Sequence, residues 1–269
     1  MHFNHRHILI TGASGGIGAA LAQALAREGA SLLLHGRNPD ALNDLAGQCL
    51  HLGAQEVQIC CADLAIATGR EQLVACVSRG FPRLDTLINN AGISRFQLFD
   101  QQPPEQIEQL ITTNITAPIL LTRALIAPLL NSDGEAPVIL NIGSAFGSIG
   151  FPGYSTYCAS KGAIRLFSEA LAREFSDTAL RVQYLAPRAT RTHINSDNAN
   201  AMTAATGSAI DSPERVARAA LKLLRSGRAQ AAVGWPEKLL VRLNGLRPEL
   251  ISRVLGKQLG KIKTFANQP

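Results

Sequence analysis

Residues 11–18 read TGASGGIG and follow a short apolar run, HILIT at 7–11. A helical pattern begins directly after them. Gly12, Gly16 and Gly18 permit a tight turn and a close approach of the backbone to a pyrophosphate, which the free amide groups of a helix N-terminus attract. This order predicts a strand, a phosphate-binding loop and a helix. A glycine-rich loop is a weak signal by itself, so an ordinary strand-to-helix turn is the alternative.

Short apolar runs rich in β-forming residues alternate with longer helical patterns along most of the chain. The expected strands span 7–11, 31–35, 57–61, 84–89, 138–142 and 181–185. This alternation predicts an α/β fold, a Rossmann-type doubly wound parallel β-sheet with helices on both faces. We expect one domain over residues 1–235, with an irregular segment near 188–212, and a C-terminal helical extension over 236–269.

The end of the second expected strand, LLLHGRN at 32–38, bears on the choice of nucleotide. An acidic residue there would bind the ribose hydroxyls of NAD(H) and repel a 2′-phosphate. Gly36 and Arg37 occupy this place instead, and the first carboxylate, Asp40, comes only after Pro39. A guanidinium binds a phosphate through two parallel hydrogen bonds. The pattern favours NADP(H) over NAD(H), with a solvated loop arginine as the alternative.

The composition excludes several classes of protein. The 269 residues are 46% hydrophobic and 17% charged, which is typical of a soluble globular protein. The net charge of +6 lies almost wholly in the tail, so the main body has no nucleic-acid footprint. Five cysteines without metal-ligand spacing predict reduced thiols and no metal. Arg123 and two prolines interrupt the apolar run at 117–130, and the N-terminus lacks a signal-peptide core, so we expect a cytoplasmic protein.

The stretch YSTYCASK at 154–161 combines two tyrosines with a lysine. Residues four apart lie on one face of a helix, and Tyr157 and Lys161 have that spacing. Tyr154 lies two helical turns from the lysine. If the ammonium group acts on a phenol, Tyr157 is therefore the candidate, and Tyr154 is expected in a pocket wall. Such a pair is common on helix surfaces, so its meaning depends on the other motifs.

Together the motifs resemble those of the short-chain dehydrogenase/reductase family, over about residues 7–235. They are TGASGGIG at 11–18, Asp63 and Leu64, NNAG at 89–92, Asn114, Ser144, and YCASK at 157–161. The resemblance implies a catalytic set of Ser144, Tyr157 and Lys161, supported by Asn114. It also implies cofactor contacts from Gly12, Ser14, Gly16, Ile17, Gly18, Arg37, Asp63, Leu64, Asn90, Tyr157, Lys161, Pro187, Thr190 and Thr192.

The implied set suits proton transfer at a carbonyl. A free phenol has a pKa near 10, which we expect the Lys161 ammonium and an oxidised nicotinamide to lower. Tyr157 then donates a proton to a carbonyl oxygen or accepts one from an alcohol, while Ser144 hydrogen-bonds the same oxygen. By resemblance, Lys161 also holds the nicotinamide ribose, and Asn114 orders a water. We predict an NADP(H)-dependent ketoreductase; the alternative is a non-catalytic dinucleotide-binding regulator or scaffold.

One motif departs from the family pattern. After the sixth strand the family has Pro-Gly, whereas this chain has Pro187 followed by Arg188, with Thr192 retained. Arginine enters positive-φ conformations only at a steric cost, so the nicotinamide contacts could differ here. Either Arg188 is solvated, which we favour, or it meets a phosphate of the cofactor or an anionic substrate.

Apolar side chains are expected near the nicotinamide and predict a hydrophobic ketone or 3-oxoacyl-type substrate. They are Phe96, Leu98, Phe99, Phe146, Ile149 and Phe151, some of which could instead belong to the core. By resemblance, residues 188–212 form a substrate lid and the protein is a homodimer or homotetramer. Ser212 and Pro213 predict the start of a helix just after this lid.

The C-terminal extension has apolar residues at helical spacing and a basic stripe of Arg253, Lys257 and Lys261. A basic amphipathic helix can bind an anionic membrane surface or an acidic partner such as an acyl carrier. Pro248 and three glycines interrupt the pattern. We therefore expect the extension to pack on its own domain or across a dimer.

Overall fold

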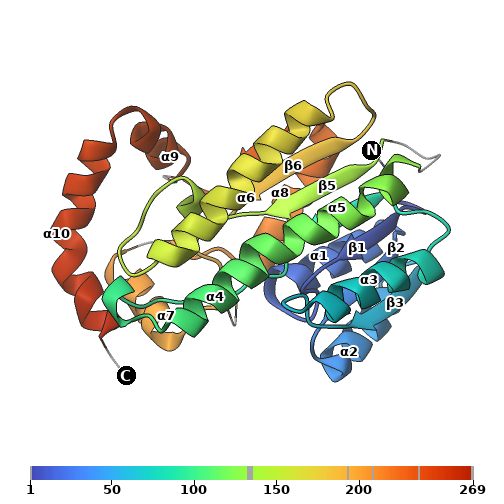
Figure 1. Cartoon of the computed structure of the whole chain (residues 1–269), viewed down its shortest axis with the longest axis horizontal. Coiled ribbons are helices and arrows are strands. Elements are labelled where there is room, and N and C mark those ends of the chain that lie inside the picture. Colours follow the sequence, from blue (N-terminus) through green and yellow to red (C-terminus); the bar gives the residue numbers. More distant parts are fainter. Residues whose placement is uncertain (1, 132–135, 193, 208, 236, 268–269) are drawn as a thin grey trace.

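Seven parallel strands form one sheet in the order β3-β2-β1-β4-β5-β6-β7, in a computed structural model that describes residues 2–131, 136–192, 194–207, 209–235 and 237–267 (Figure 1). The strands are β1 (His7–Ile10), β2 (Ser31–Gly36), β3 (Glu56–Cys61), β4 (Thr86–Asn89), β5 (Val138–Ile142), β6 (Arg181–Ala186) and β7 (Gln230–Ala232). The first six agree with the predicted strands. The chain crosses from β3 back past β1 to β4, and this reversal opens a crevice at the carboxyl ends of β1 and β4.

Helices cover both faces of the sheet (Figure 1). They are α1 (Gly16–Ala26), α2 (Pro39–His51), α3 (Ala67–Gly80), α4 (Pro104–Ile111), α5 (Ala117–Leu130), α6 (Ser155–Glu174), α7 (Asp197–Ala205), α8 (Pro213–Ser226), α9 (Glu237–Leu246) and α10 (Pro248–Ala266). Apolar residues of α1, α2 and α8 form the core on one face, and those of α3, α5 and α6 form the core on the other. The predicted Rossmann-type architecture is confirmed.

The apolar run at 104–130 forms α4, a π-helical turn (Thr112–Thr116) and α5. Within the described residues, this is the one helix that is long and apolar enough to cross a membrane by length and composition, a test that the core helix of a soluble protein also passes. Leu121, Leu125 and Leu129 are buried in the core against the sheet. The run therefore functions as a core helix of the α/β fold.

The segment between β6 and α8 contains a helix that the weak sequence pattern did not predict. In α7, the Ser196 side chain accepts a hydrogen bond from the backbone N–H of Ala199 and caps the N-terminus. The predicted start of α8 is confirmed, because Pro213 is its first residue and the Ser212 side chain accepts from the N–H of Arg215. The small strand β7 was also missed.

The expected C-terminal extension forms α9 and α10, with Pro236 and residues 268–269 outside the described residues. Pro248 is the first residue of α10, where a proline is tolerated because its missing N–H would be unpaired anyway. Figure 1 shows the two helices as an arm beside the carboxyl ends of the strands, with the end of α10 beside α7. Ile251 and Ile262 of α10 are buried.

Candidate active site

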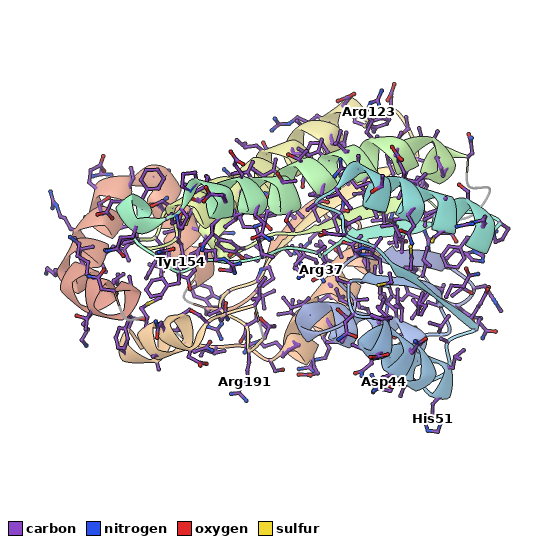
Figure 2. All side chains as sticks on the ribbon, turned by 60° about the horizontal axis from the view of Figure 1, so that its bottom comes forward. Arg37, Asp44, His51, Arg123, Tyr154 and Arg191 are labelled. Atoms are coloured by element: carbon purple, nitrogen blue, oxygen red, sulfur yellow. The ribbon has the colours of Figure 1, made fainter. Side chains whose placement is uncertain are left out.

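A pocket of about 890 Å³ lies at the carboxyl ends of the strands. It gathers most of the predicted site residues: Gly12, Ser14, Gly16, Ile17, Arg37, Asp63, Leu64, Asn90, Ser144, Tyr157, Lys161, Pro187, Thr190 and Thr192. Arg37 and Tyr154, both labelled in Figure 2, mark two separate parts of it. Gly18 and Asn114 do not line the pocket.

The glycine-rich loop has the cradle shape that a pyrophosphate requires. Gly12 has a φ of +63°, and a Cβ atom there would lie 2.8 Å from the Cα of Ala91. Gly16 has a φ of +54°, and a Cβ there would lie 2.8 Å from a side-chain carbon of Thr192. At Gly18 a Cβ would overlap the carbonyl oxygen of Gly12. These residues therefore fit a dinucleotide. Gly18 does not line the pocket, but its lack of a side chain allows the loop to pack closely on the start of α1.

His35 supports this loop, although it was not among the predicted site residues. The Nδ1 atom accepts a hydrogen bond from the N–H of Gly12 at 3.4 Å, so Nε2 carries the proton that it donates to the Ala62 carbonyl oxygen at 3.0 Å. Burial lowers the pKa of His35 to about 4, and the hydrogen bond to Ala62 only partly opposes this. The imidazole is therefore neutral at pH 7. A titratable residue in a strand dominated by leucine was the available signal.

The end of the pocket where the sequence predicts adenosine contacts combines a cation with a carboxylate. Arg37 is exposed just after β2 and makes no ion pair with a described residue. Asp63 accepts a hydrogen bond from the N–H of Ala65 at 2.9 Å, which orients its carboxylate. At Gly36, a Cβ atom would come within 3.0 Å of the Ser14 hydroxyl oxygen. Gly36 therefore lies close against Ser14, and the exposed Arg37 follows it at the end of the strand.

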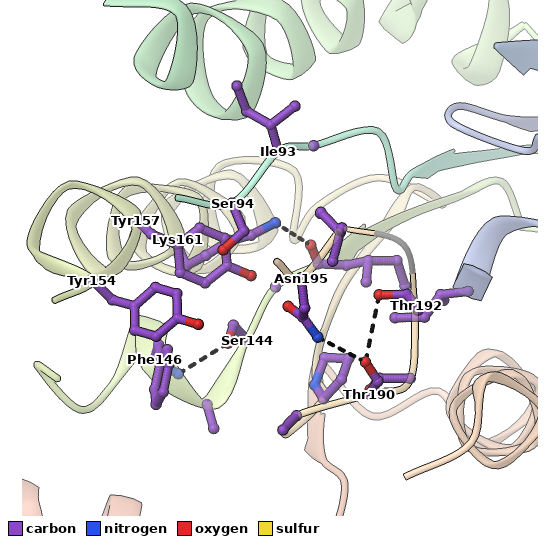
Figure 3. A pocket seen from close by; sticks show the side chains of 18 of the residues that line it. Ile93, Ser94, Ser144, Phe146, Tyr154, Tyr157, Lys161, Thr190, Thr192 and Asn195 are labelled. Carbon is purple, nitrogen blue, oxygen red and sulfur yellow. Dashed lines mark hydrogen bonds between the residues drawn. The ribbon is translucent and has the colours of Figure 1, made fainter. Parts of the chain in front are cut away.

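The three predicted catalytic residues converge in the same pocket. Tyr157 and Lys161 lie one turn apart on α6, and Ser144 lies in the short loop after β5. The Lys161 Nζ atom lies 5.7 Å from the centre of the Tyr157 ring and donates to the Ile142 carbonyl oxygen at 3.2 Å. The Ser144 hydroxyl is near enough to the Tyr157 phenol to lower its pKa, in opposition to burial. Figure 3 shows the hydroxyl groups of both residues directed into one space.

Tyr184 positions Ser144 and was also missed. Its hydroxyl accepts from the N–H of Ser144 at 3.3 Å and donates to the Ser144 carbonyl oxygen at 3.2 Å. The neighbouring Gly143 has no room for a Cβ atom, because one would overlap the Tyr184 ring. The Ser144 side chain in turn accepts from the N–H of Phe146 at 3.1 Å. Tyr184 therefore fixes the backbone of Ser144 through both its N–H and its carbonyl group.

The pKa of Tyr157 is shifted in the direction opposite to the expected one. Burial raises the pKa of the Tyr157 phenol, and the hydrogen bond with Ser144 offsets this only in part, so the expected lowering by Lys161 is not found. The physical reason is that the phenol and the ammonium are both buried. Burial also lowers the pKa of Lys161 to about 8. At pH 7, Tyr157 is thus neutral and Lys161 is mostly charged.

Asn114 lies on the π-helical turn between α4 and α5. Its Oδ1 atom accepts from the N–H of Ile93 at 2.8 Å, and its Nδ2 atom donates to the Ile93 carbonyl oxygen at 2.9 Å and to the Ser160 hydroxyl at 3.1 Å. π-Helical turns often occur at functional sites. Here the turn ties the loop after β4 to α6, which carries Tyr157 and Lys161.

Arg188 is not solvated, which corrects the favoured interpretation. Its side chain is 8% exposed, and it donates to Asp211 Oδ1 at 2.8 Å and to the Trp235 carbonyl oxygen at 2.8 Å. A Cβ atom at Gly234 would lie 2.7 Å from the Cδ atom of Arg188. Arg188 does not adopt a positive φ. The expected steric cost is therefore absent, and the arginine anchors the segment that carries Thr190 and Thr192.

Aromatic side chains form the pocket wall next to Tyr157. Tyr154, Phe146, Phe151 and Ile149 line it as expected, and the Phe146 and Phe151 rings stack at 5.0 Å. Phe96 contacts the Tyr154 ring at 5.0 Å from behind the wall. The other two expected residues, Leu98 and Phe99, do not line the pocket, and Phe99 is 64% exposed.

The protein-family model for short chain dehydrogenases matches residues 6–203 of this chain. Nodulation protein G of Rhizobium sp. (strain N33) is 36% identical over 182 residues, which cover 68% of this chain and 72% of that protein. The structure of a short-chain dehydrogenase from Sphingobium yanoikuyae in complex with NADPH is 32% identical, with a TM-score of 0.76, and covers 92% of this chain and 95% of that one.

A short-chain dehydrogenase/reductase from Burkholderia phymatum, solved in complex with NAD, has a TM-score of 0.84 over 93% of this chain and 96% of that one. At 20% identity it shows the fold alone. The family assignment rests on the family model, which matches more than half of the chain, and on the 36% identity to nodulation protein G. This chain belongs to the short-chain dehydrogenase family and is an oxidoreductase of that family.

Proposed function

We propose that the protein is an NADP(H)-dependent ketoreductase that reduces the carbonyl group of a hydrophobic ketone or 3-oxoacyl-type compound to an alcohol, reversibly. The observation that carries this proposal is the meeting of Ser144, Tyr157 and Lys161 in the pocket that the glycine-rich loop also lines. A non-catalytic dinucleotide-binding regulator, the second candidate, would have no use for this arrangement.

The chain's own groups suit the reduction direction. Tyr157 is protonated at pH 7, so its hydroxyl can donate a proton to the carbonyl oxygen while Ser144 hydrogen-bonds that oxygen. The charged Lys161 then stabilises the phenolate that remains. The bound dinucleotide, when present, supplies the hydride.

NADPH is the favoured form of the cofactor. Arg37 has no ion-pair partner within the described residues and stands where a 2′-phosphate would be recognised. The Sphingobium relative, which is 32% identical, was solved with NADPH. The glycine loop, Asp63, Leu64 and Asn90 would hold the rest of the dinucleotide. We further propose a cytoplasmic homodimer or homotetramer without nucleic-acid partners.

Tyr157→Phe tests the reaction. Because the variant lacks the proton donor, we expect kcat to fall by at least about 100-fold, with the Kd for NADPH unchanged within about twofold. Turnover is followed by NADPH absorbance with a panel of hydrophobic ketones, and cofactor binding by nucleotide fluorescence. Tyr154→Phe is the matched control, since it removes a neighbouring phenol and should retain most activity. Full turnover by Tyr157→Phe would refute the mechanism.

A further inference from the structure

The C-terminal arm, α9 and α10, is tied across the site at three places. The Asn244 side chain donates to the Ser148 carbonyl oxygen at 2.8 Å, in the loop that follows Ser144. The Lys261 ammonium donates to the Ala205 carbonyl oxygen at the end of α7 at 3.4 Å. Gln101 donates to the Asn267 side chain at 3.0 Å. The arm therefore spans from one side of the pocket to the other.

One face of α10 forms a wall of the pocket. Ile251, Val254, Leu255 and Gln258 line it, joined by Leu240 of α9. These four α10 positions follow the spacing i, i+3, i+4 and i+7, which defines a single helical face. The basic residues of α10 do not line the pocket. The arm thus presents an uncharged and mostly apolar surface inward, with Gln258 as its polar member.

The apolar surface continues from the arm to the catalytic tyrosine. Ile262 and Phe265 of α10 pack in one cluster with Met202 of α7, and the same cluster includes Tyr154 and Tyr157. The Phe146 ring lies 6.5 Å from the Tyr157 ring, edge to face. A substrate carbonyl held at Tyr157 would therefore have apolar side chains along the path to α10.

We propose that the arm selects the substrate: Ile251 and Leu255 of α10 contact the far end of an uncharged carbonyl compound whose elongated apolar body extends from Tyr157. This inference rests on the proposed ketoreductase function. Each additional methylene buried is worth about fourfold in affinity. A carboxylate at the far end would lose its hydration against Ile251 and Leu255 without gaining a charged partner from α10.

A series of methyl ketones from 2-butanone to 2-decanone tests the assignment in the full-length enzyme. We expect kcat/KM to rise with chain length in the unaltered enzyme, and 9-oxodecanoate to react at least tenfold less efficiently than 2-decanone. Ile251→Trp and Leu255→Trp fill the far end, so they should lower kcat/KM for 2-decanone at least tenfold and change that for 2-butanone less than twofold. Ser252→Trp, on an exposed position of the same helix, is the matched control.

A binding measurement separates this inference from the proposed function. With saturating NADP⁺, 1-decanol should raise the Tm of the unaltered enzyme and of Ser252→Trp but not of Ile251→Trp or Leu255→Trp. If no ketone is reduced but these shifts appear, the proposed function fails and the apolar pocket stands. If the Trp variants bind 1-decanol and reduce 2-decanone like the unaltered enzyme, the inference is overturned. Circular dichroism confirms that each variant is folded.

Discussion

His35 shows how a single buried side chain links the cofactor loop to stability. It joins the first glycine of the loop to the end of β3 through one hydrogen bond on each ring nitrogen. This arrangement requires the neutral ring, because a protonated Nδ1 could not accept from the N–H of Gly12. The pKa of His35 falls to about 4 because the ring is buried, whereas an unfolded histidine titrates near 6.5. The folded state is therefore disfavoured by protonation of this residue.

Acid should consequently weaken the fold through His35. Its contribution is complete above pH about 6.5 and is lost as the pH falls toward the folded value of about 4. Between pH 7 and pH 5 we expect the free energy of unfolding to fall by about 2 kcal/mol through this group. Urea unfolding followed by circular dichroism at both pH values measures the loss. In His35→Gln the same change of pH should have a smaller effect, and an identical decrease would exclude this origin.

The basic amphipathic pattern of the C-terminal helices is compatible with two roles, binding to a membrane surface and packing on the domain. The basic stripe of α10 would also suit an anionic membrane surface. In the structure Ile251 and Ile262 of the same helix are buried, and Ile262 packs in a cluster with Met202 and Tyr154. The predicted interruptions do not break α10, because Gly245 lies in the last turn of α9, Pro248 is the first residue of α10, and α10 continues through Gly256 and Gly260.

Deletion of residues 237–269 should therefore destabilise the enzyme. The loss of two buried isoleucines at about 1.5–3 kcal/mol each should lower the Tm by at least about 5 °C, and the uncovered apolar surface should promote aggregation. Calorimetry and light scattering provide the measurements. Arg253→Glu with Lys257→Glu is the control, because it reverses exposed charges and keeps the packing. A stable, active truncation that no longer binds anionic vesicles would favour the membrane interpretation.

The molecule as a whole assembles its pocket from loops after almost every strand, together with the arm. Residues that are far apart in the sequence, such as Arg37, Asn90 and Thr192, meet only in the folded chain. A ligand of this pocket binds the folded state alone and so stabilises it. The stabilisation measures cofactor preference without any substrate.

NADP⁺ should accordingly raise the Tm more than NAD⁺ does. At a concentration of about 100 times the Kd, the stabilisation is about 2.7 kcal/mol, equivalent to roughly 5–10 °C for a chain of this size. Arg37→Asp should reverse the preference, because the carboxylate repels the 2′-phosphate. Differential scanning fluorimetry with each nucleotide provides the comparison. Equal shifts with both nucleotides in the unaltered enzyme would contradict the NADP(H) proposal.

Local signals were enough to predict the sheet, the glycine loop and the site motifs. Strand periodicity, glycine spacing and the four-residue interval between Tyr157 and Lys161 depend on neighbours in the sequence, so they can be recognised without the fold. The start of α8 at Pro213 was predictable for the same reason. The edge strand β7 and the helix α7 carry little apolar periodicity, and tertiary packing is what stabilises them.

Only the tertiary structure revealed the partners that act across long distances in the sequence. The sequence favoured a solvated Arg188, because its partners, Asp211 and the Trp235 carbonyl group, are distant in the sequence. The pKa of Tyr157 depends on burial, which reverses the direction expected from a nearby ammonium. His35, Tyr184 and the inward face of α10 join the site because strands and helices distant in sequence meet at one end of the sheet. Residue type and spacing carry local preferences, whereas desolvation and long-range contacts exist only after folding.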